Sequence, residues 1–140
     1  MKRAAVIVDT NVVAAGLLTG SDSSPVVRIL DGMLAARFPF VVSGALLAEY
    51  RTVLVRPGLR KLHGLSVVEV ETLLTDIALH AIVLTPGVGP RAPDPGDQLL
   101  WNLLGTRADL TLITGDKLLL GDAAMSGRVI SPREFVAGLE

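Results

Sequence analysis

Short apolar runs alternate along the chain with longer segments in which apolar residues recur every three or four positions. Continuous apolar runs of four or five residues are typical of strands that are buried on both faces of a parallel sheet. Such a run predicts a strand at 4–8. Short segments rich in apolar residues predict further strands at 40–43, 81–84 and 110–114, and a weaker fifth strand at 128–130.

The segments between these runs carry helix signals. The predicted helices span residues 24–36, 44–55 and 66–79, and two more begin at 97 and 131. Ser66 and Glu69 form a capping-box pattern, in which each side chain bonds to the backbone N–H of the other residue. Pro57-Gly58 predicts the end of the second helix, and the stretch 85–96, rich in Pro and Gly, predicts a loop.

This alternation predicts an α/β fold, namely a three-layer α/β/α sandwich around a mainly parallel sheet of four or five strands. A length of 140 residues favours a single domain over 1–140. The chain is 50% hydrophobic and 19% charged, which excludes an intrinsically disordered tail and predicts a sizeable core.

Composition also narrows the chemistry and the location. The chain has no Cys, which excludes disulfides, zinc–thiolate sites and thiol nucleophiles. No apolar stretch approaches the ~20 residues of a membrane span, and the apolar run before Asp9 is too short for a signal peptide, so we expect a cytoplasmic protein without membrane contact. Because the net charge is −1, contact with nucleic acid would need a local basic patch.

Four of the fourteen acidic residues occupy positions from which they could converge. Asp9 and Asp116 follow predicted parallel strands, and ligands bind at the carboxyl ends of such strands. Glu49 falls at the edge of the apolar stripe of the helix predicted at 44–55. Asp97 begins the helix predicted from residue 97, on the buried side of that helix.

Convergence of these carboxylates would be costly without a counter-ion. Two unit charges ~4 Å apart repel by about 4 kcal/mol at an effective dielectric constant of ~20. A divalent cation offsets this repulsion, and an all-oxygen donor set without His or Cys selects Mg²⁺ or Mn²⁺ over zinc. Such an ion can assist hydrolysis of a phosphodiester. The four acids therefore indicate metal-assisted hydrolysis of phosphodiester bonds.

Four sequence blocks resemble the PIN-domain family, in order and over nearly the whole chain. The blocks are VIVDTNVVAAGL, VVSGALLAEYRTVL, DPGDQLLWNLL followed by ADLTLITGDKLLL, and VISPREF. They are most similar to the bacterial branch of toxin components of toxin–antitoxin pairs.

The resemblance implies an endoribonuclease that uses Mg²⁺ or Mn²⁺ to cleave RNA. It assigns the metal and catalytic roles to Asp9, Glu49, Asp97 and Asp116, with Asp94 as a substitute for Asp97. It assigns supporting roles to Thr10, Asn11 and Thr114. It also implies an antitoxin partner and a homodimer, for which the helices at 26–36 and 44–55 are candidates.

The chain departs from the family at Leu118, where many relatives carry a further acid, so we expect at least one bound ion. A catalytically inactive PIN scaffold that binds RNA or protein therefore stays open, as does a phosphotransfer domain with Asp9 as the acceptor. D-T-N lacks the second acid that phosphotransfer folds usually have beside the acceptor. Arg51, Arg56 and Lys117 are candidates for contacts with RNA phosphates, although a solvated basic face explains them equally well.

Overall fold

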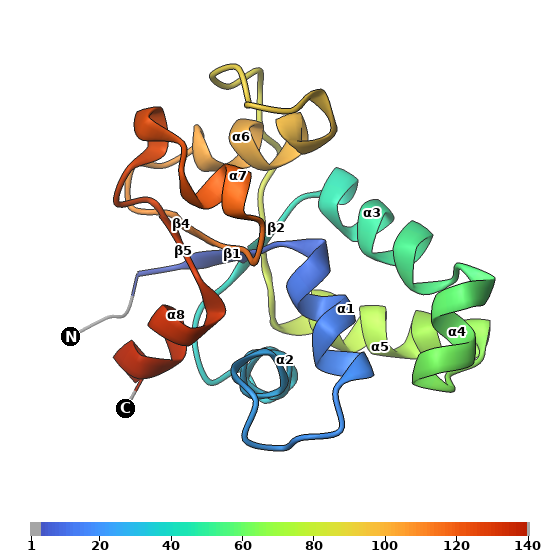
Figure 1. Cartoon of the computed structure of the whole chain (residues 1–140). Helices are drawn as coiled ribbons and strands as arrows, with labels where there is room; N and C mark the ends of the chain where they lie inside the picture. Colours follow the sequence, from blue (N-terminus) through green and yellow to red (C-terminus); the bar gives the residue numbers. More distant parts are fainter. Residues whose placement is uncertain (1–3, 140) are drawn as a thin grey trace.

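The computed structural model describes residues 4–139, and Figure 1 shows its arrangement. The strands are β1 (Val6–Val8), β2 (Val41–Val42), β3 (Ile82–Val83), β4 (Thr111–Ile113) and β5 (Val129–Ile130). The α-helices are α1 (Thr10–Leu18), α2 (Pro25–Leu34), α3 (Gly44–Leu54), α4 (Pro57–His63), α5 (Val67–His80), α6 (Gln98–Leu104), α7 (Lys117–Leu120) and α8 (Pro132–Leu139). Two 3₁₀ turns are η1 (Pro95–Asp97) and η2 (Ala123–Met125).

All strand pairs among the described residues are parallel, as predicted. One sheet has three strands in the order β1-β4-β5, and β2 pairs with β3 in a second ladder. A single parallel bridge from Val6 to Phe40 connects the two ladders. The structure therefore divides the predicted single sheet of four or five strands into a three-stranded sheet and a two-stranded ladder. The reason is that β2 is so short that only one bridge joins it to β1.

Helices cover both faces of the strands. Figure 1 shows α6 and α7 above the strands and α2 and α8 below them. Helix α6 packs on β1 and β4, while α2 packs against α1, α5 and α8. This arrangement confirms the predicted α/β fold with a mainly parallel sheet. Within residues 4–139, no helix is both long enough and apolar enough to cross a membrane.

The core is continuous and dominated by aliphatic side chains. Its largest fully buried members include Trp101, Tyr50 and Phe40. Phe38 packs edge-on against both Phe40 and Phe135, which ties the segment before β2 to α8. Trp101 is a fully buried core residue of α6.

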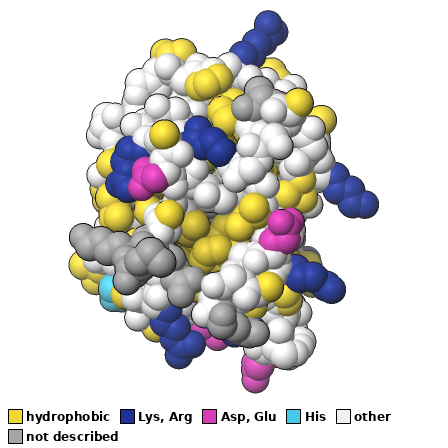
Figure 2. All heavy atoms as spheres, turned by 90° about the vertical axis from the view of Figure 1, so that its left-hand side faces the viewer, with side chains coloured by type: hydrophobic (Ala, Val, Ile, Leu, Met, Phe, Trp, Pro, Cys, Tyr) yellow, Lys and Arg dark blue, Asp and Glu magenta, His cyan; other side chains and the backbone are white. Residues whose placement is uncertain are grey.

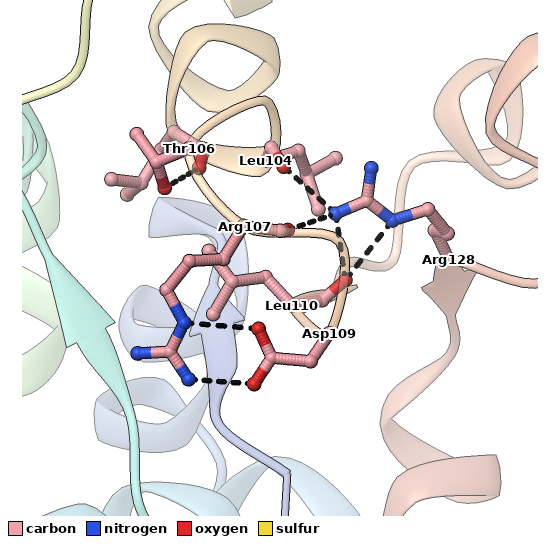
Figure 3. A network of polar contacts seen from close by, with 7 residues as sticks. Leu104, Thr106, Arg107, Asp109, Leu110 and Arg128 are labelled. Atoms are coloured by element: carbon pink, nitrogen blue, oxygen red, sulfur yellow. Dashed lines mark hydrogen bonds and ion pairs between the residues drawn. The ribbon is translucent and has the colours of Figure 1, made fainter.

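A network of polar contacts fastens the end of α6 to β4 and β5 (Figure 3). The Arg128 guanidinium donates hydrogen bonds to the carbonyl oxygens of Leu104 and Arg107, both at 2.7 Å, and of Leu110 at 3.2 Å. These three carbonyls belong to the turn that leads from α6 into β4. Arg128 therefore sets the path by which the chain enters β4.

Capping signals located the long helices well. Ser66 and Glu69 form the predicted capping box of α5, with both bonds at 3.1 Å. The helix predicted at 44–55 is α3, which ends at Leu54. Three helices were missed: α1, α4 and α7. Pro57-Gly58 follows the end of α3, as predicted, but Pro57 is also the first residue of α4, where its missing N–H costs no bond.

Candidate active site

Asp9 lies at the junction between β1 and α1, and only 6% of its surface is exposed. It occupies the N-cap position of α1, but its carboxylate makes no capping bond. Instead, Oδ2 accepts hydrogen bonds from Thr114 Oγ1 at 2.7 Å and from Asn11 Nδ2 at 3.3 Å. The carboxylate is therefore held by Thr114, which follows β4, and by the Asn11 side chain, rather than by a capping bond to its own helix.

Thr114 connects Asp9 to Asp116. Thr114 follows β4 and is fully buried, and its Oγ1 accepts a 3.0 Å bond from the backbone N–H of Asp116 while donating to Asp9. Asp116 in turn caps α7, because its Oδ1 accepts the N–H of Leu118 at 2.9 Å. Two acids that are far apart in sequence are thus joined through one hydroxyl group.

Glu49 reaches the same region from α3. Its side chain is half-buried, and Oε2 accepts a 2.5 Å hydrogen bond from Thr10 Oγ1. The next residue, Tyr50, is fully buried, and its hydroxyl donates to the backbone carbonyl of Val8. Tyr50 therefore anchors α3 to the strand that ends in Asp9. The sequence placed Tyr50 in the apolar stripe but gave no indication of this anchoring bond.

Asp97 ends η1 and precedes α6, whose N-cap position it occupies. Its carboxylate makes no capping bond, whereas the nearby Asp94 accepts the N–H of Gly96 at 2.8 Å. Burial and the charges of neighbouring carboxylates raise the pKa of Asp97 to about 6. In decreasing order of effect, those carboxylates are Asp9, Asp116, Asp94 and Glu49. A capping role therefore does not account for Asp97.

The carboxylates share one electrostatic environment. Burial raises the pKa of Asp9, bonds from Thr114 and the Thr10 backbone oppose this, and Glu49 and Asp116 raise the pKa further. Among residues 4–139, no Lys or Arg forms an ion pair with Asp9, Glu49, Asp97 or Asp116. The structure thus gathers negative charge at the carboxyl ends of β1 and β4 and provides no basic side chain to neutralise it.

The donor chemistry of these residues fits a hard divalent cation, because the groups that interact are carboxylates. In the described part of the chain, however, no three Asp, Glu, His or Cys side chains lie close enough together to hold a metal ion. Mutual repulsion opposes a closer approach of like charges, which a bound cation would offset. Metal binding at this site therefore requires the side chains to move toward one another.

The three predicted RNA-binding residues lie in different settings. Arg51 forms an exposed 2.5 Å ion pair with Glu71, while Arg56 precedes α4 and Lys117 begins α7, both exposed. On the face that Figure 2 shows, the visible Lys and Arg side chains are scattered singly around hydrophobic ones. A continuous basic surface is not seen among the described residues of that face.

Residues 5–118 match a family model described as PIN domain. A search of curated proteins found no match. The matched range contains Asp9, Glu49, Asp97 and Asp116 and ends two residues after the last of them.

Proposed function

The chain belongs to the PIN-domain family, whose members are generally nucleases, and from this premise we propose that it is a metal-dependent endoribonuclease. The observation that carries the proposal is the shared environment of these acids: Glu49 and Asp116 raise the pKa of Asp9, and Asp9 and Asp116 raise the pKa of Asp97. Such a concentration of unneutralised carboxylates is typical of sites that bind divalent cations.

In this proposal Asp9, Glu49, Asp97 and Asp116 hold Mg²⁺ or Mn²⁺. When bound, such an ion polarises the phosphate and lowers the pKa of a coordinated water. Asp9 is the central ligand, because it is the most buried of the four and the best fixed in position. All four side chains come from segments that the fold holds at one edge of the strands.

Neighbouring residues of the chain orient these acids, and Glu49 accepts a proton. Thr114 and Asn11 fix Oδ2 of Asp9 and thereby orient the carboxylate. Thr10 fixes one oxygen of Glu49, and the second oxygen accepts a proton from the attacking water. Lys117 and Arg56 contact the phosphates of the RNA backbone.

We also propose the finer role that the motifs suggest: the toxin of a toxin–antitoxin pair, in the cytoplasm, with an antitoxin partner. The support is the similarity of the D-T-N, A-E-Y and T-G-D blocks to that branch. A homodimer through α2 and α3 belongs to the same proposal, and light scattering on the purified protein measures it.

A thermal melt with and without Mg²⁺ or Mn²⁺, on the wild type and on Asp9→Asn, tests the metal site. A ligand that binds only the folded state stabilises it by about 2.7 kcal/mol at one hundred times its dissociation constant. We expect this gain in the wild type and not in Asp9→Asn, together with loss of RNA cleavage in the variant. An Asp9→Asn protein that cuts at the wild-type rate contradicts the assignment. RNA binding without metal-dependent cleavage supports the inactive scaffold instead.

A further inference from the structure

A cavity lies at the same edge of the strands as Asp9. Because Val6 and Phe40 form a parallel bridge, Ser43 lies level with Asp9 in the register of the neighbouring strands. Ser43 lines a cavity of about 400 Å³. Other lining residues are Ala45, Leu84, Thr85, Leu99 and Asn102.

The walls of this cavity are the same elements that carry the acids. Ala45 lies in the first turn of α3, which bears Glu49 four residues later. Leu99 and Asn102 lie on α6, which follows Asp97, and the two helices contact each other. The cavity and two of the acids are therefore carried by the same pair of neighbouring elements.

Asn102 contributes a hydrogen-bond donor of fixed orientation. Its Oδ1 accepts the N–H of Gly89 at 2.8 Å and Nε2 of Gln98 at 3.0 Å. Because the Gly89 N–H can only donate, it fixes which atom of the amide is oxygen. Within residues 4–139 the Asn102 Nδ2 group has no hydrogen-bond acceptor. The Asn102 Nδ2 group can therefore only donate hydrogen bonds.

The lining combines apolar surface with this donor and two hydroxyls. Leu84 and Leu99 supply apolar surface, while Ser43 and Thr85 carry hydroxyl groups. Apolar walls with a few oriented polar groups are typical of small-molecule sites. Sequence-specific RNA recognition reads the edges of unstacked bases held between such surfaces.

We propose that this cavity binds one base of the RNA substrate, adjacent to the scissile phosphate, and that Asn102 donates to an acceptor on the edge of that base. The inference rests on the proposed function, because RNA cleavage is what brings a nucleotide chain to this edge. It makes Asn102 a specificity-determining residue and predicts a preferred base at one position next to the cut.

Two tryptophan substitutions on α3 test the cavity. Ala45→Trp fills it, whereas Ala48→Trp places the same bulk on the same helix in the groove toward α5. With random-sequence RNA as the probe, we expect one base to be enriched beside the cuts made by the wild type and by Ala48→Trp. We expect Ala45→Trp to lose this enrichment. Enrichment that persists in Ala45→Trp, or that is missing from the wild type, overturns the proposal.

Asn102→Asp tests the donor itself. The substitution keeps an oxygen for Gly89 and Gln98 but replaces the N–H donors with a second acceptor. We expect the enriched base to change, whatever happens to the overall rate. An unchanged preference contradicts the role of Asn102.

A measurement without catalysis separates this inference from the proposed function. The four ribonucleosides are titrated into the protein, and the NMR signals of the Asn102 side-chain amide are followed. We expect at least one nucleoside to shift these signals at millimolar concentration in the wild type and in Ala48→Trp, but not in Ala45→Trp. If no nucleoside does so, the cavity proposal fails even when RNA is cleaved. If a nucleoside binds and no RNA is cleaved, the nuclease proposal fails while the base site stands.

Discussion

At the scale of single residues, the site is organised by side chains that hold the acids rather than by the acids alone. Thr114 donates to Asp9 and accepts the backbone N–H of Asp116, and Thr10 donates to Glu49. Asp97 differs from these three acids, because within residues 4–139 its carboxylate accepts no hydrogen bond, and its pKa is raised to about 6. Its ionisation is therefore the property most open to measurement.

The stability of the metal-free protein should depend on the protonation of Asp97. The pKa of this carboxyl is raised from 3.8 to about 6 on folding, so the folded state favours its protonated form. The resulting stabilisation is complete at low pH and is lost as the pH rises through about 6. In EDTA, we expect the unfolding free energy of the wild type to fall more steeply between about pH 4 and 7 than that of Asp97→Asn. Parallel urea-denaturation profiles for the two proteins would contradict this.

At the scale of elements, the region around α6 is held by contacts on both sides. The loop before it approaches so closely that a Cβ at Gly89 would lie 2.6 Å from the carbonyl oxygen of Trp101. Gln98 donates to the carbonyl of Pro90 and accepts the N–H of Ala92, which ties the same loop to the first turn of α6. At the other end, Arg128 binds the carbonyls that follow the helix (Figure 3). Asp97 and the cavity are positioned by these contacts.

Gly89→Ala should destabilise the protein, because the added Cβ meets backbone atoms of α6 that cannot rotate away. Overpacking of this kind costs about 1–3 kcal/mol. Gly87→Ala is the matched control in the same loop, since nothing lies within 4 Å of a Cβ there. Urea denaturation measures both. Equal stability of the two variants would show that the loop is not docked as described.

Arg128→Ala should lower the unfolding free energy by about 2–3 kcal/mol, since bonds from a charged donor to three carbonyls are lost together. Arg128→Lys should recover only part of this, because an ammonium group lacks the planar fork of the guanidinium. Arg133→Ala, at an exposed position of α8, is the control and should change stability by less than about 0.5 kcal/mol. A wild-type denaturation midpoint for Arg128→Ala would contradict the role of this network.

At the scale of the whole molecule, a net charge of −1 and a concentrated acidic site pose a problem for binding RNA. Under the proposed function, a divalent cation offsets this negative charge once the acidic side chains have moved toward one another. The three candidate RNA-contacting residues, Arg51, Arg56 and Lys117, lie on α3, before α4 and at the start of α7. We therefore expect divalent cations to promote both RNA binding and cleavage.

The proposed toxin role predicts an effect on growing cells. Expression of the wild type in bacteria should arrest growth, and expression of Asp9→Asn at the same level should not, because the variant lacks the central ligand. Matched protein levels on a blot and a matched thermal melt are the controls. Normal growth with a wild-type protein that cleaves RNA in vitro would remove the toxin role and leave the nuclease proposal intact.

The sequence by itself determined the class of fold and the approximate position of most elements. The segments at 4–8 and 110–114, rich in apolar residues, identified β1 and β4, because a strand that is buried on both faces carries apolar side chains on both. The capping box at Ser66 located the start of α5, because capping depends on residues only three positions apart. The same local signals failed for α1, whose sequence TNVVAAGLL lacks a polar face of helical period, and for the four-residue α7.

Only the tertiary structure decided how these elements meet. The order β1-β4-β5, the separate β2-β3 ladder and the level of Ser43 beside Asp9 depend on pairings between distant segments, which local patterns do not encode. The bond between Thr114 and Asp9 spans 105 positions, and the cavity beside it is walled by two helices and a loop. The sequence could identify each acid separately as a candidate site residue, because each follows a local signal. Their shared charge and the neighbouring cavity arise from packing, since electrostatic interaction and cavity shape depend on distances that only the folded chain defines.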